Sequence, residues 1–307
     1  MMQKVLFVYN PVSSGFNIAG RLDHISGRLM EAGMLPTIYR TSAEEDGFSM
    51  EQQLADLLSS GGYSKLIVSG GDGTVNSIVN ILMKSGISIP IGILPTGTAN
   101  DFARSIGIPK NLDKSIEVIL HGNQQDIDIG VINSSDYFVN TCAGGIFMDI
   151  TYSTNRGLKK NIGPFAYYLQ ALGEMSGIKP FKCRLTMDSQ IFEDDILLFL
   201  ITNGRHAGGF SNINRFADVS DGIMDIVVVR NCPTMNLAGL FIRTLGNGLP
   251  EDKYIANFRG SSCLVESETP VFLSVDGEKG PSLPIYVNFL QGKLKVFVPD
   301  SFVILKE

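Results

Sequence analysis

The first part of the chain alternates compact apolar runs with segments of helical periodicity. Residues 4–10 form an apolar run that ends just before Pro11, as a buried strand followed by a turn does. Apolar residues then recur every three or four positions from Ile18 to Leu29, which puts them on one face of a helix. Further strands are predicted at 35–41, 66–68 and 90–94, with helices at 49–61 and 75–82 between them. This alternating order predicts a parallel sheet covered by helices.

The pattern changes near residues 126–131, where short strand-like runs replace the strand–helix order. Two helical segments, at 163–175 and 235–245, interrupt these runs, and Gln291–Gly292 predicts a tight hairpin between the last two. The second part is therefore predicted to be an antiparallel sandwich or barrel. Its strands are expected at 126–132, 137–141, 181–187, 196–203, 224–230, 263–266, 271–275, 285–290 and 294–298.

Composition narrows the class of protein. The chain has 25 Lys and Arg against 31 Asp and Glu, and this acidity argues against a nucleic-acid-binding protein. The longest apolar run, Ile196–Ile201, is far shorter than the ~20 residues that cross a bilayer. Met1–Lys4 leads straight into a strand-like run, so no signal peptide is expected. The four cysteines are too widely spaced for a CxxC motif or a zinc ribbon, which favours free thiols in a reducing cytoplasm.

A glycine-rich loop, Ser69–Thr74, follows the third predicted strand directly and opens a helix. Open α/β sheets bind ligands at this end of their strands, and glycines let backbone N–H groups approach phosphate oxygens. The loop is not a P-loop, because no lysine follows it. Asp72 has the wrong charge for a bare phosphate, so it is expected to contact a divalent ion or a ribose hydroxyl, or to orient the loop. A metal–nucleotide complex is indicated, with a tight turn chosen for packing as the alternative.

Two more polar loops are expected beside it. Pro95–Arg104 follows the fourth predicted strand with Gly and Thr residues before a helix, and the turn 10–15 follows the first strand. Carboxyl ends of neighbouring parallel strands meet at one edge of a sheet. Three such loops at one edge predict a nucleotide site suited to a triphosphate.

These motifs, with Asp276-Gly277-Glu278 further on, resemble the diacylglycerol kinase catalytic-domain family. That family includes bacterial soluble diacylglycerol kinases, which the chain resembles in length, and eukaryotic sphingosine and ceramide kinases. The motifs span residues 10 to 278. NAD kinases and phosphofructokinases carry loops like Gly70–Thr74, whereas Pro95–Arg104 with a downstream Asp-Gly-Glu is more discriminating.

The resemblance implies an α/β fold in two domains. An amino-terminal, NAD-kinase-like α/β nucleotide domain would take up residues 1–128, and a carboxyl-terminal antiparallel β-sandwich that binds lipid would take up 129–298. The extreme carboxyl terminus, about 299–307, would return to the first domain.

The resemblance also implies roles for individual residues. Asp276 and Glu278 would be catalytic. Asp221 would hold a structural divalent ion with backbone oxygens of Asp218 and Ile223, and Arg104 and Asp128 would link the active site to that ion. The ATP-binding positions would be Asn10, Pro11, Val12, Ser13, Ser14, Thr41, Gly70, Gly71, Asp72, Gly73, Thr74, Val75, Asn76 and Thr98. The chain departs from the family at Ser77, where a Glu is usual.

The residues alone leave the catalytic roles open. Phosphoryl transfer needs alignment, charge neutralisation and a proton acceptor for the attacking hydroxyl. Asp276 and Glu278 lie two apart at the end of the predicted strand 271–275, so alternation lets both face one side. One would accept the proton while the other holds Mg²⁺ or orients the first. A glycine-centred hairpin with solvated acids is the alternative, and 218–223 taken alone is typical of a solvated turn.

The expected function is therefore an ATP- and Mg²⁺-dependent lipid kinase that converts diacylglycerol, or a related lipid alcohol, to phosphatidate. It would be a cytoplasmic enzyme that visits the inner membrane face. A homodimer is compatible with this interpretation. Two alternatives stay open: an NAD-kinase-like small-molecule kinase, and a catalytically weak nucleotide- or lipid-binding sensor, for which Ser77 is the hint. Arg156, Lys159 and Lys160 precede the aromatic-rich segment 162–175, which predicts either membrane docking or packing on the sandwich.

Overall fold

The computed structural model of the chain describes residues 2–13, 17–41, 50–146, 179–188, 190–214 and 217–303. The chain divides into two compact units, and each is described by itself below. Unit 1 comprises Met1–Ile127 and Gly292–Glu307, and unit 2 comprises Asp128–Gln291. The predicted helix at 163–175, its basic flank at 156–160 and Ser14 lie outside the described residues.

Unit 1 is built on a parallel sheet, as the strand–helix alternation predicts. Its strands follow the order β15–β4–β3–β1–β2, and each neighbouring pair is parallel. The strands are β1 (Gln3–Tyr9), β2 (Met34–Arg40), β3 (Lys65–Gly70), β4 (Ile91–Pro95) and the end of β15 (Ile285–Val298). The helices are α1 (Leu22–Glu31, after the 3-10 turn Ala19–Arg21), α2 (Met50–Gly61), α3 (Asp72–Lys84), α4 (Asp101–Ser105) and α5 (Leu112–His121).

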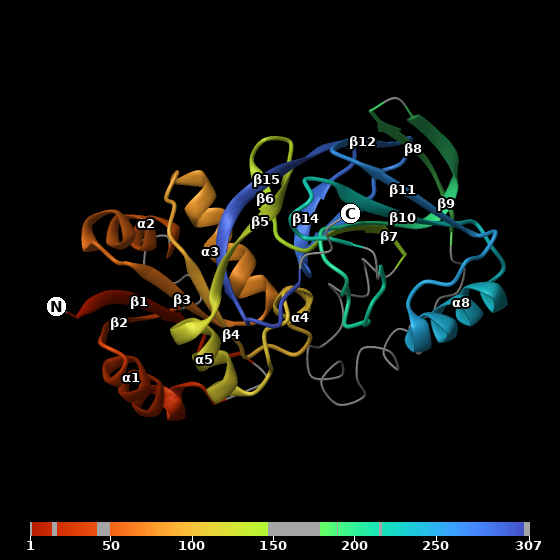
Figure 1. Cartoon of the computed structure of the whole chain (residues 1–307). Helices are drawn as coiled ribbons and strands as arrows, with labels where there is room; N and C mark the ends of the chain where they lie inside the picture. The colour runs from red at the N-terminus through yellow and green to blue at the C-terminus, as the bar shows by residue number, and fades with distance from the viewer. Residues whose placement is uncertain are drawn as a thin grey trace. The chain divides into compact units, whose positions relative to one another are not determined.

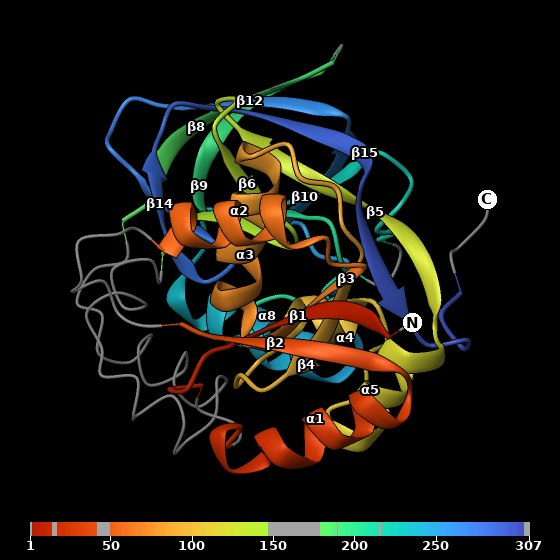
Figure 2. The ribbon, with the colours of Figure 1, turned by 90° about the vertical axis from the view of Figure 1, so that its left-hand side faces the viewer.

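Helices cover both faces of this sheet. Figures 1 and 2 show α1 and α5 on one face and α2 and α3 on the other. Every residue of β3 and β4 is buried, which explains why these strands read as continuous apolar runs and not as alternating ones. Ile25 and Leu29 of α1 pack with Ile116 and Ile119 of α5 in the core of this unit. No helix among the described residues is long and apolar enough to cross a membrane.

Unit 2 is an antiparallel β structure, which confirms the predicted change of class. Its strands follow the order β14–β13–β7–β9–β8–β12–β15, and β9 also pairs with β10, which pairs with β11. The strands are β6 (Asp136–Phe138), β7 (Thr141–Gly145), β8 (Phe181–Met187), β9 (Gln190–Thr202), β10 (Met224–Arg230), β11 (Ile255–Gly260), β12 (Ser262–Ser267), β13 (Phe272–Val275) and β14 (Glu278–Ser282); α8 spans Thr234–Asn247, and β5 (Asn123–Ile132) enters from unit 1.

The core of unit 2 is formed by residues on the buried faces of its strands. Cys183, Leu185 and Met187 are the buried positions of β8, and they alternate with more exposed ones. They share a cluster with residues from β9, β10, β12, β13 and β15, among them Phe199 and Val287. Strands from both ends of the sheet order thus contribute to one core, as in a sandwich.

Two strand predictions are wrong. The hairpin expected at Gln291–Gly292 does not form, because β15 is one continuous strand of 14 residues. Its first part pairs with β12 and its last part with β4, so each half has its own partner, and Gly292 takes its positive φ within the strand. The chain accordingly rejoins unit 1 at Gly292 and not near 299. The run 137–141 is divided between β6 and β7.

Three of the four cysteines are buried, which leads to a prediction about thiol reactivity. Burial raises the pKa of Cys183 and of Cys263 to about 12, and it also raises the pKa of Cys142, beside the Asp276 carboxylate. Thiolates are the reactive species. At pH 8 a disulfide reagent is expected to react promptly with Cys232 alone and, after urea unfolding, with all four free thiols. Prompt reaction of two or more thiols in the native protein would contradict this burial.

Candidate functional site

The three polar loops lie at one edge of the sheet in unit 1. Tyr9 stands beside Ser69, and Gly70 stands beside Pro95, in the parallel register of β1, β3 and β4. The turn after β1, the glycine loop after β3 and the loop after β4 therefore begin at the same level of the sheet. This agrees with the common edge that the strand order predicts.

Hydroxyl and amide side chains tie these loops to one another. Asn10 Nδ2 donates to Thr74 Oγ1 at 3.0 Å, which joins the first turn to the start of α3. Ser13 Oγ donates to the Thr96 carbonyl at 2.6 Å, which joins it to the loop after β4. The buried hydroxyls of Ser69 and Thr96 lie 3.3 Å apart. The three loops are thus held together in one preformed arrangement.

Other predicted ATP-binding residues flank this arrangement. The Val12 N–H donates to Asn10 Oδ1, so Pro11 and Val12 form a tight turn in which the Val12 side chain is exposed. Thr41 is buried after β2, and its N–H and hydroxyl both donate to the Tyr9 carbonyl. The Thr98 side chain is exposed. Val75 is buried and faces the core of unit 1, and its N–H donates to the Gly71 carbonyl at 3.1 Å.

The backbones of the two glycine-bearing loops touch. A Cβ placed on Gly97 would lie 2.4 Å from the Gly71 Cα and 2.7 Å from Asn100 Oδ1. Asn100 adopts a left-handed conformation, with a φ of 53°, and its side-chain amide pairs with both the N–H and the carbonyl of Gly97. Glycine at 71 and 97 therefore permits a contact that no other residue allows.

Asp72 orients the loops. It is the first residue of α3, and its Oδ1 accepts a hydrogen bond from the Phe102 N–H at 3.1 Å, at the start of α4. Burial raises the pKa of Asp72, while backbone N–H groups of Phe102, Asp101 and Asn100 act in the opposite direction. Of the three roles open from the sequence, the described contacts support the orientation of the loop after β4. Gly73 and Asn76 lie in the same first turns of α3, where Ser77 Oγ donates to the Gly73 carbonyl at 2.9 Å.

Replacing Asp72 by Asn is expected to shift the difference in stability between variant and parent in favour of the variant as pH rises. A raised folded-state pKa means that the Asp72 contribution to stability is full below the ordinary pKa of about 3.9 and is lost as pH rises through the folded value. Asn stays neutral and can still accept from the Phe102 N–H. Urea unfolding of both proteins at several pH values from 3 to 8 measures the difference. A stability difference between variant and parent that stays constant from pH 3 to 8 would contradict this.

Arg104 makes an ion pair inside its own helix. Its Nη1 lies 3.2 Å from Asp101 Oδ1, and Asp101 is buried. This is the local pair that the three-residue spacing indicates. Arg104 belongs to unit 1 and Asp128 to unit 2, and the network proposed between them remains a prediction.

In unit 2, Asp276 and Gly277 form the two-residue turn between β13 and β14. Both have positive φ, 47° and 86°, as an Asp-Gly hairpin turn requires. Asp276 is 4% exposed. Its Oδ1 accepts the N–H groups of Asn140 and Thr141 at 3.0 and 2.8 Å, and its Oδ2 accepts that of Val139 at 2.8 Å. These bonds also explain why residues 139 and 140 do not continue the strand.

The expected geometry of the acid pair is therefore wrong. The strand ends at Val275, so strand alternation does not relate Asp276 to Glu278. Glu278 is instead the first residue of β14, opposite Val275, and it is exposed. The glycine-centred hairpin that was the alternative does form, but one of its two acids is buried and bound to backbone N–H groups. The two carboxylates thus have different environments.

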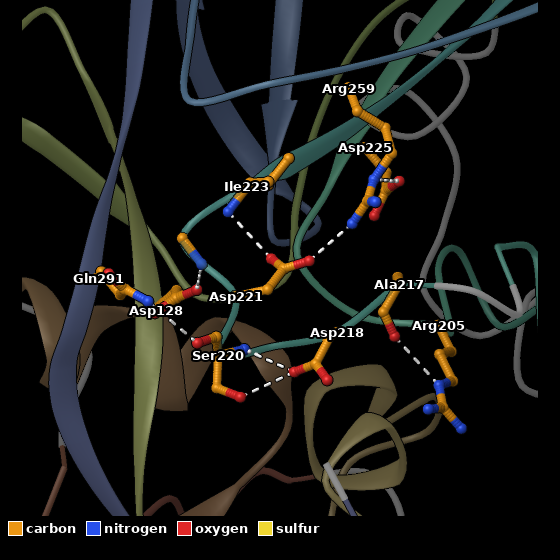
Figure 3. A network of polar contacts seen from close by, with 11 residues as sticks. Asp128, Arg205, Ala217, Asp218, Ser220, Asp221, Ile223, Asp225, Arg259 and Gln291 are labelled. Atoms are coloured by element: carbon orange, nitrogen blue, oxygen red, sulfur yellow. Dashed lines mark hydrogen bonds and ion pairs between the residues drawn. The ribbon is translucent and has the colours of Figure 1, made fainter. Parts of the chain in front are cut away.

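The loop 218–223 is organised by its own acids. Asp218 Oδ1 accepts from the N–H and the hydroxyl of Ser220, and Asp221 Oδ1 accepts from the Ile223 N–H (Figure 3). Asp128, fully buried, accepts from the Gly222 N–H through Oδ2 at 2.5 Å, and its own N–H donates to the Val219 carbonyl. Asp128 therefore shapes this loop directly.

The loop partly fits a hard cation such as Mg²⁺. It presents oxygen ligands, which such cations prefer. Asp218 Oδ2 is buried and has no hydrogen-bond partner among the described residues, as an oxygen awaiting a cation would be. Asp221 Oδ2, however, already lies 2.6 Å from Arg259 Nη2. Across the described ranges, no three His, Cys, Asp or Glu side chains cluster as metal ligands.

Several residues of this arrangement were not singled out from the sequence. They are Thr96, the N–H groups of residues 139–141, Asp225 and Arg259. Asn100, placed between Gly97 and a helix start, carried a local signal, because Asn tolerates the left-handed region. The partners of Asp276 and Arg259 lie far away in the sequence, so no local pattern could reveal them.

Comparison with known proteins gives matches along both units. Residues 4–132 match the diacylglycerol kinase catalytic domain, and residues 144–298 match the YegS C-terminal NAD kinase beta sandwich-like domain.

Individual relatives match over almost the whole chain. A diacylglycerol kinase of Staphylococcus carnosus is 31% identical over 303 residues, covering 98% of this chain and 97% of the relative. One of Staphylococcus saprophyticus is 32% identical with the same coverage. The crystal structure of a diacylglycerol kinase from Bacillus anthracis superposes with a TM-score of 0.77 at 25% identity and covers 98% of both chains. A second crystal structure from that organism gives a TM-score of 0.84 at 26% identity, with 98% and 97% covered.

Proposed function

Because this chain belongs to the diacylglycerol kinase family, we propose that it transfers the γ-phosphoryl group of ATP to the primary hydroxyl of diacylglycerol. The hydroxyl oxygen forms a bond to the γ-phosphorus, and the bond from that phosphorus to the β–γ bridging oxygen breaks. The products are phosphatidate and ADP, and the hydroxyl proton passes to a carboxylate of the enzyme.

The observation that carries this proposal is the set of three tied loops in unit 1. The Gly71–Gly97 contact and the bonds from Asn10 and Ser13 hold backbone N–H groups beside the start of α3. Exposed N–H groups and the helix dipole at such a start favour phosphate oxygens. A preformed cradle of this kind supports binding of a nucleoside triphosphate. Mg²⁺, when bound, would neutralise part of the charge on the phosphates.

The two acids of the hairpin are proposed to have separate roles. Glu278 is exposed, so its carboxylate can approach a substrate hydroxyl and accept its proton. Asp276 is buried and accepts three backbone N–H groups, so it acts as a positioning residue that fixes the turn from which Glu278 projects.

Transfer of labelled phosphate tests the function. The protein is incubated with [γ-³²P]ATP and MgCl₂, and separately with dioleoylglycerol, sphingosine or ceramide in mixed micelles, or with NAD. Labelled phosphatidate is expected, and omission of MgCl₂ should abolish it. Label in NAD alone would support the NAD-kinase-like alternative and refute the proposal. Label in sphingosine or ceramide alone would keep a lipid kinase and change its substrate.

The residue at position 77 supports testing the sensor alternative in the same experiment. Ser77 replaces the family's usual carboxylate, and its hydroxyl is bound within α3 to the Gly73 carbonyl. ATP binding without transfer to any acceptor would support a nucleotide-binding sensor.

Because diacylglycerol resides in membranes, the proposed kinase would work as a peripheral protein at the inner membrane face. Sedimentation with dioleoylglycerol-containing vesicles tests that placement, and no co-sedimentation would contradict it.

A further inference from the structure

Arg259 bridges two carboxylates that come from different elements of unit 2. In the antiparallel register of β10 and β11 it stands directly opposite Asp225, and its Nε lies 3.1 Å from Asp225 Oδ1. Its Nη2 donates to Asp221 Oδ2, in the loop 218–223, at 2.6 Å. Figure 3 shows the guanidinium between these two acids. A planar guanidinium can make both contacts at once because its N–H groups point in fixed, diverging directions.

The acids around Arg259 need a positive partner. Asp225 is 5% exposed, and its Oδ2 is buried without a hydrogen-bond partner in the part of unit 2 that the structure describes. Burial raises the pKa of Asp221 and of Asp225, and neighbouring acids, Asp218 for the first and Asp221 for the second, act in the same direction. The Ile223 N–H and the Arg259 charge lower the pKa of Asp221, and the Arg259 charge and the Asn214 side chain lower that of Asp225. Without this cation, the loop would bring carboxylates together in a poorly hydrated place.

We propose that Arg259 is the internal counter-cation of the loop 218–223 and competes with a divalent cation for Asp221 Oδ2. The inference rests on the cation site that accompanies the proposed function. Asp221 Oδ1 is engaged by the Ile223 N–H, so Oδ2 is the oxygen for which the two cations compete. Arg259 thereby lets the loop keep its shape without a bound ion and weakens the affinity of the loop for one.

Removing the guanidinium should make the loop dependent on metal. For Arg259→Gln, the Mg²⁺ dissociation constant, measured by calorimetry with MgCl₂ and no nucleotide, is expected to fall about fivefold, the size of a partly exposed ion pair. In EDTA the unfolding temperature of Arg259→Gln should be lower than that of the parent. Addition of MgCl₂ should raise the unfolding temperature of the variant by more than it raises that of the parent.

A matched control is Arg243→Gln. Arg243 Nη2 lies 2.6 Å from Asp252 Oδ2, and its side chain is 50% exposed against 44% for Arg259. It belongs to α8 and contacts none of the acids of the loop in the described structure. This variant should lose a similar ion pair with no change in Mg²⁺ affinity.

Two further variants guard against a merely unfolded protein. Arg259→Lys keeps the charge, but one ammonium group cannot reproduce the two-sided contact, so an intermediate Mg²⁺ affinity is expected. Asp221→Asn should abolish Mg²⁺ binding in the parent and in Arg259→Gln alike. The proposal is overturned if Arg259→Gln and Arg259→Lys bind Mg²⁺ no more tightly than the parent, or if Mg²⁺ binding survives Asp221→Asn. These readouts need no phosphoryl transfer, so they stand apart from a failure of the kinase assay.

Discussion

Glu278→Gln is expected to lower kcat about 100-fold or more, the contribution of a positioned general base, while the unfolding free energy stays unchanged. Glutamine has the size of glutamate, but its amide cannot accept the proton of the substrate hydroxyl as that hydroxyl attacks. Glu278 is exposed, so its neutralisation leaves no buried group unpaired. Steady-state transfer to dioleoylglycerol, with ATP affinity measured by calorimetry, checks the kinetic part, and urea unfolding checks the stability part.

Asp276→Asn should behave differently. An amide NH₂ would face at least one of the N–H groups of Val139, Asn140 and Thr141, so about 2–4 kcal/mol of stability should be lost together with activity, as for a buried charged hydrogen-bond acceptor. Glu251→Gln, at an exposed acid of the same unit, should change neither quantity. Full activity in Glu278→Gln would show that Glu278 is not the proton acceptor.

Gly97→Ala is expected to abolish measurable ATP binding and to cost about 1–3 kcal/mol of stability, as overpacked sites do. The added methyl group would stand 2.4 Å from the Gly71 Cα, which is backbone and cannot rotate away. The two loops must separate, and the N–H groups that they present would then diverge. Calorimetric titration with ATP and urea unfolding measure the two effects.

A control glycine in the same unit is available. Gly27 lies within α1, has no positive φ, and has no neighbouring atom within 4 Å of the place where an added Cβ would stand. Gly27→Ala should therefore stabilise unit 1 by up to about 1 kcal/mol through the helix propensity of Ala, with ATP affinity unchanged. Normal ATP affinity in Gly97→Ala would refute the idea that the contact between the loops forms the nucleotide site.

The sequence by itself determined the order of elements and the place of the glycine loops. The run Leu66–Val68 is apolar without interruption because both faces of its strand are covered, and the alternation in Phe181–Met187 reflects a strand with one buried face. Periodicity and turn residues act over a few positions, so they can be read locally. The order of parallel strands then brings Gly70 and Pro95 to one edge.

The tertiary structure alone decided which polar groups meet. Gln291–Gly292 has the residues of a turn, yet the strand continues through it because each half of β15 finds its own pairing partner. Asp276 and Glu278 differ because the N–H groups of residues 139–141 reach one of them and not the other. Arg259 meets Asp221 and Asp225 through strand register. Such contacts join residues distant in the sequence, and their energy appears only once the strands have paired, so no local pattern records them.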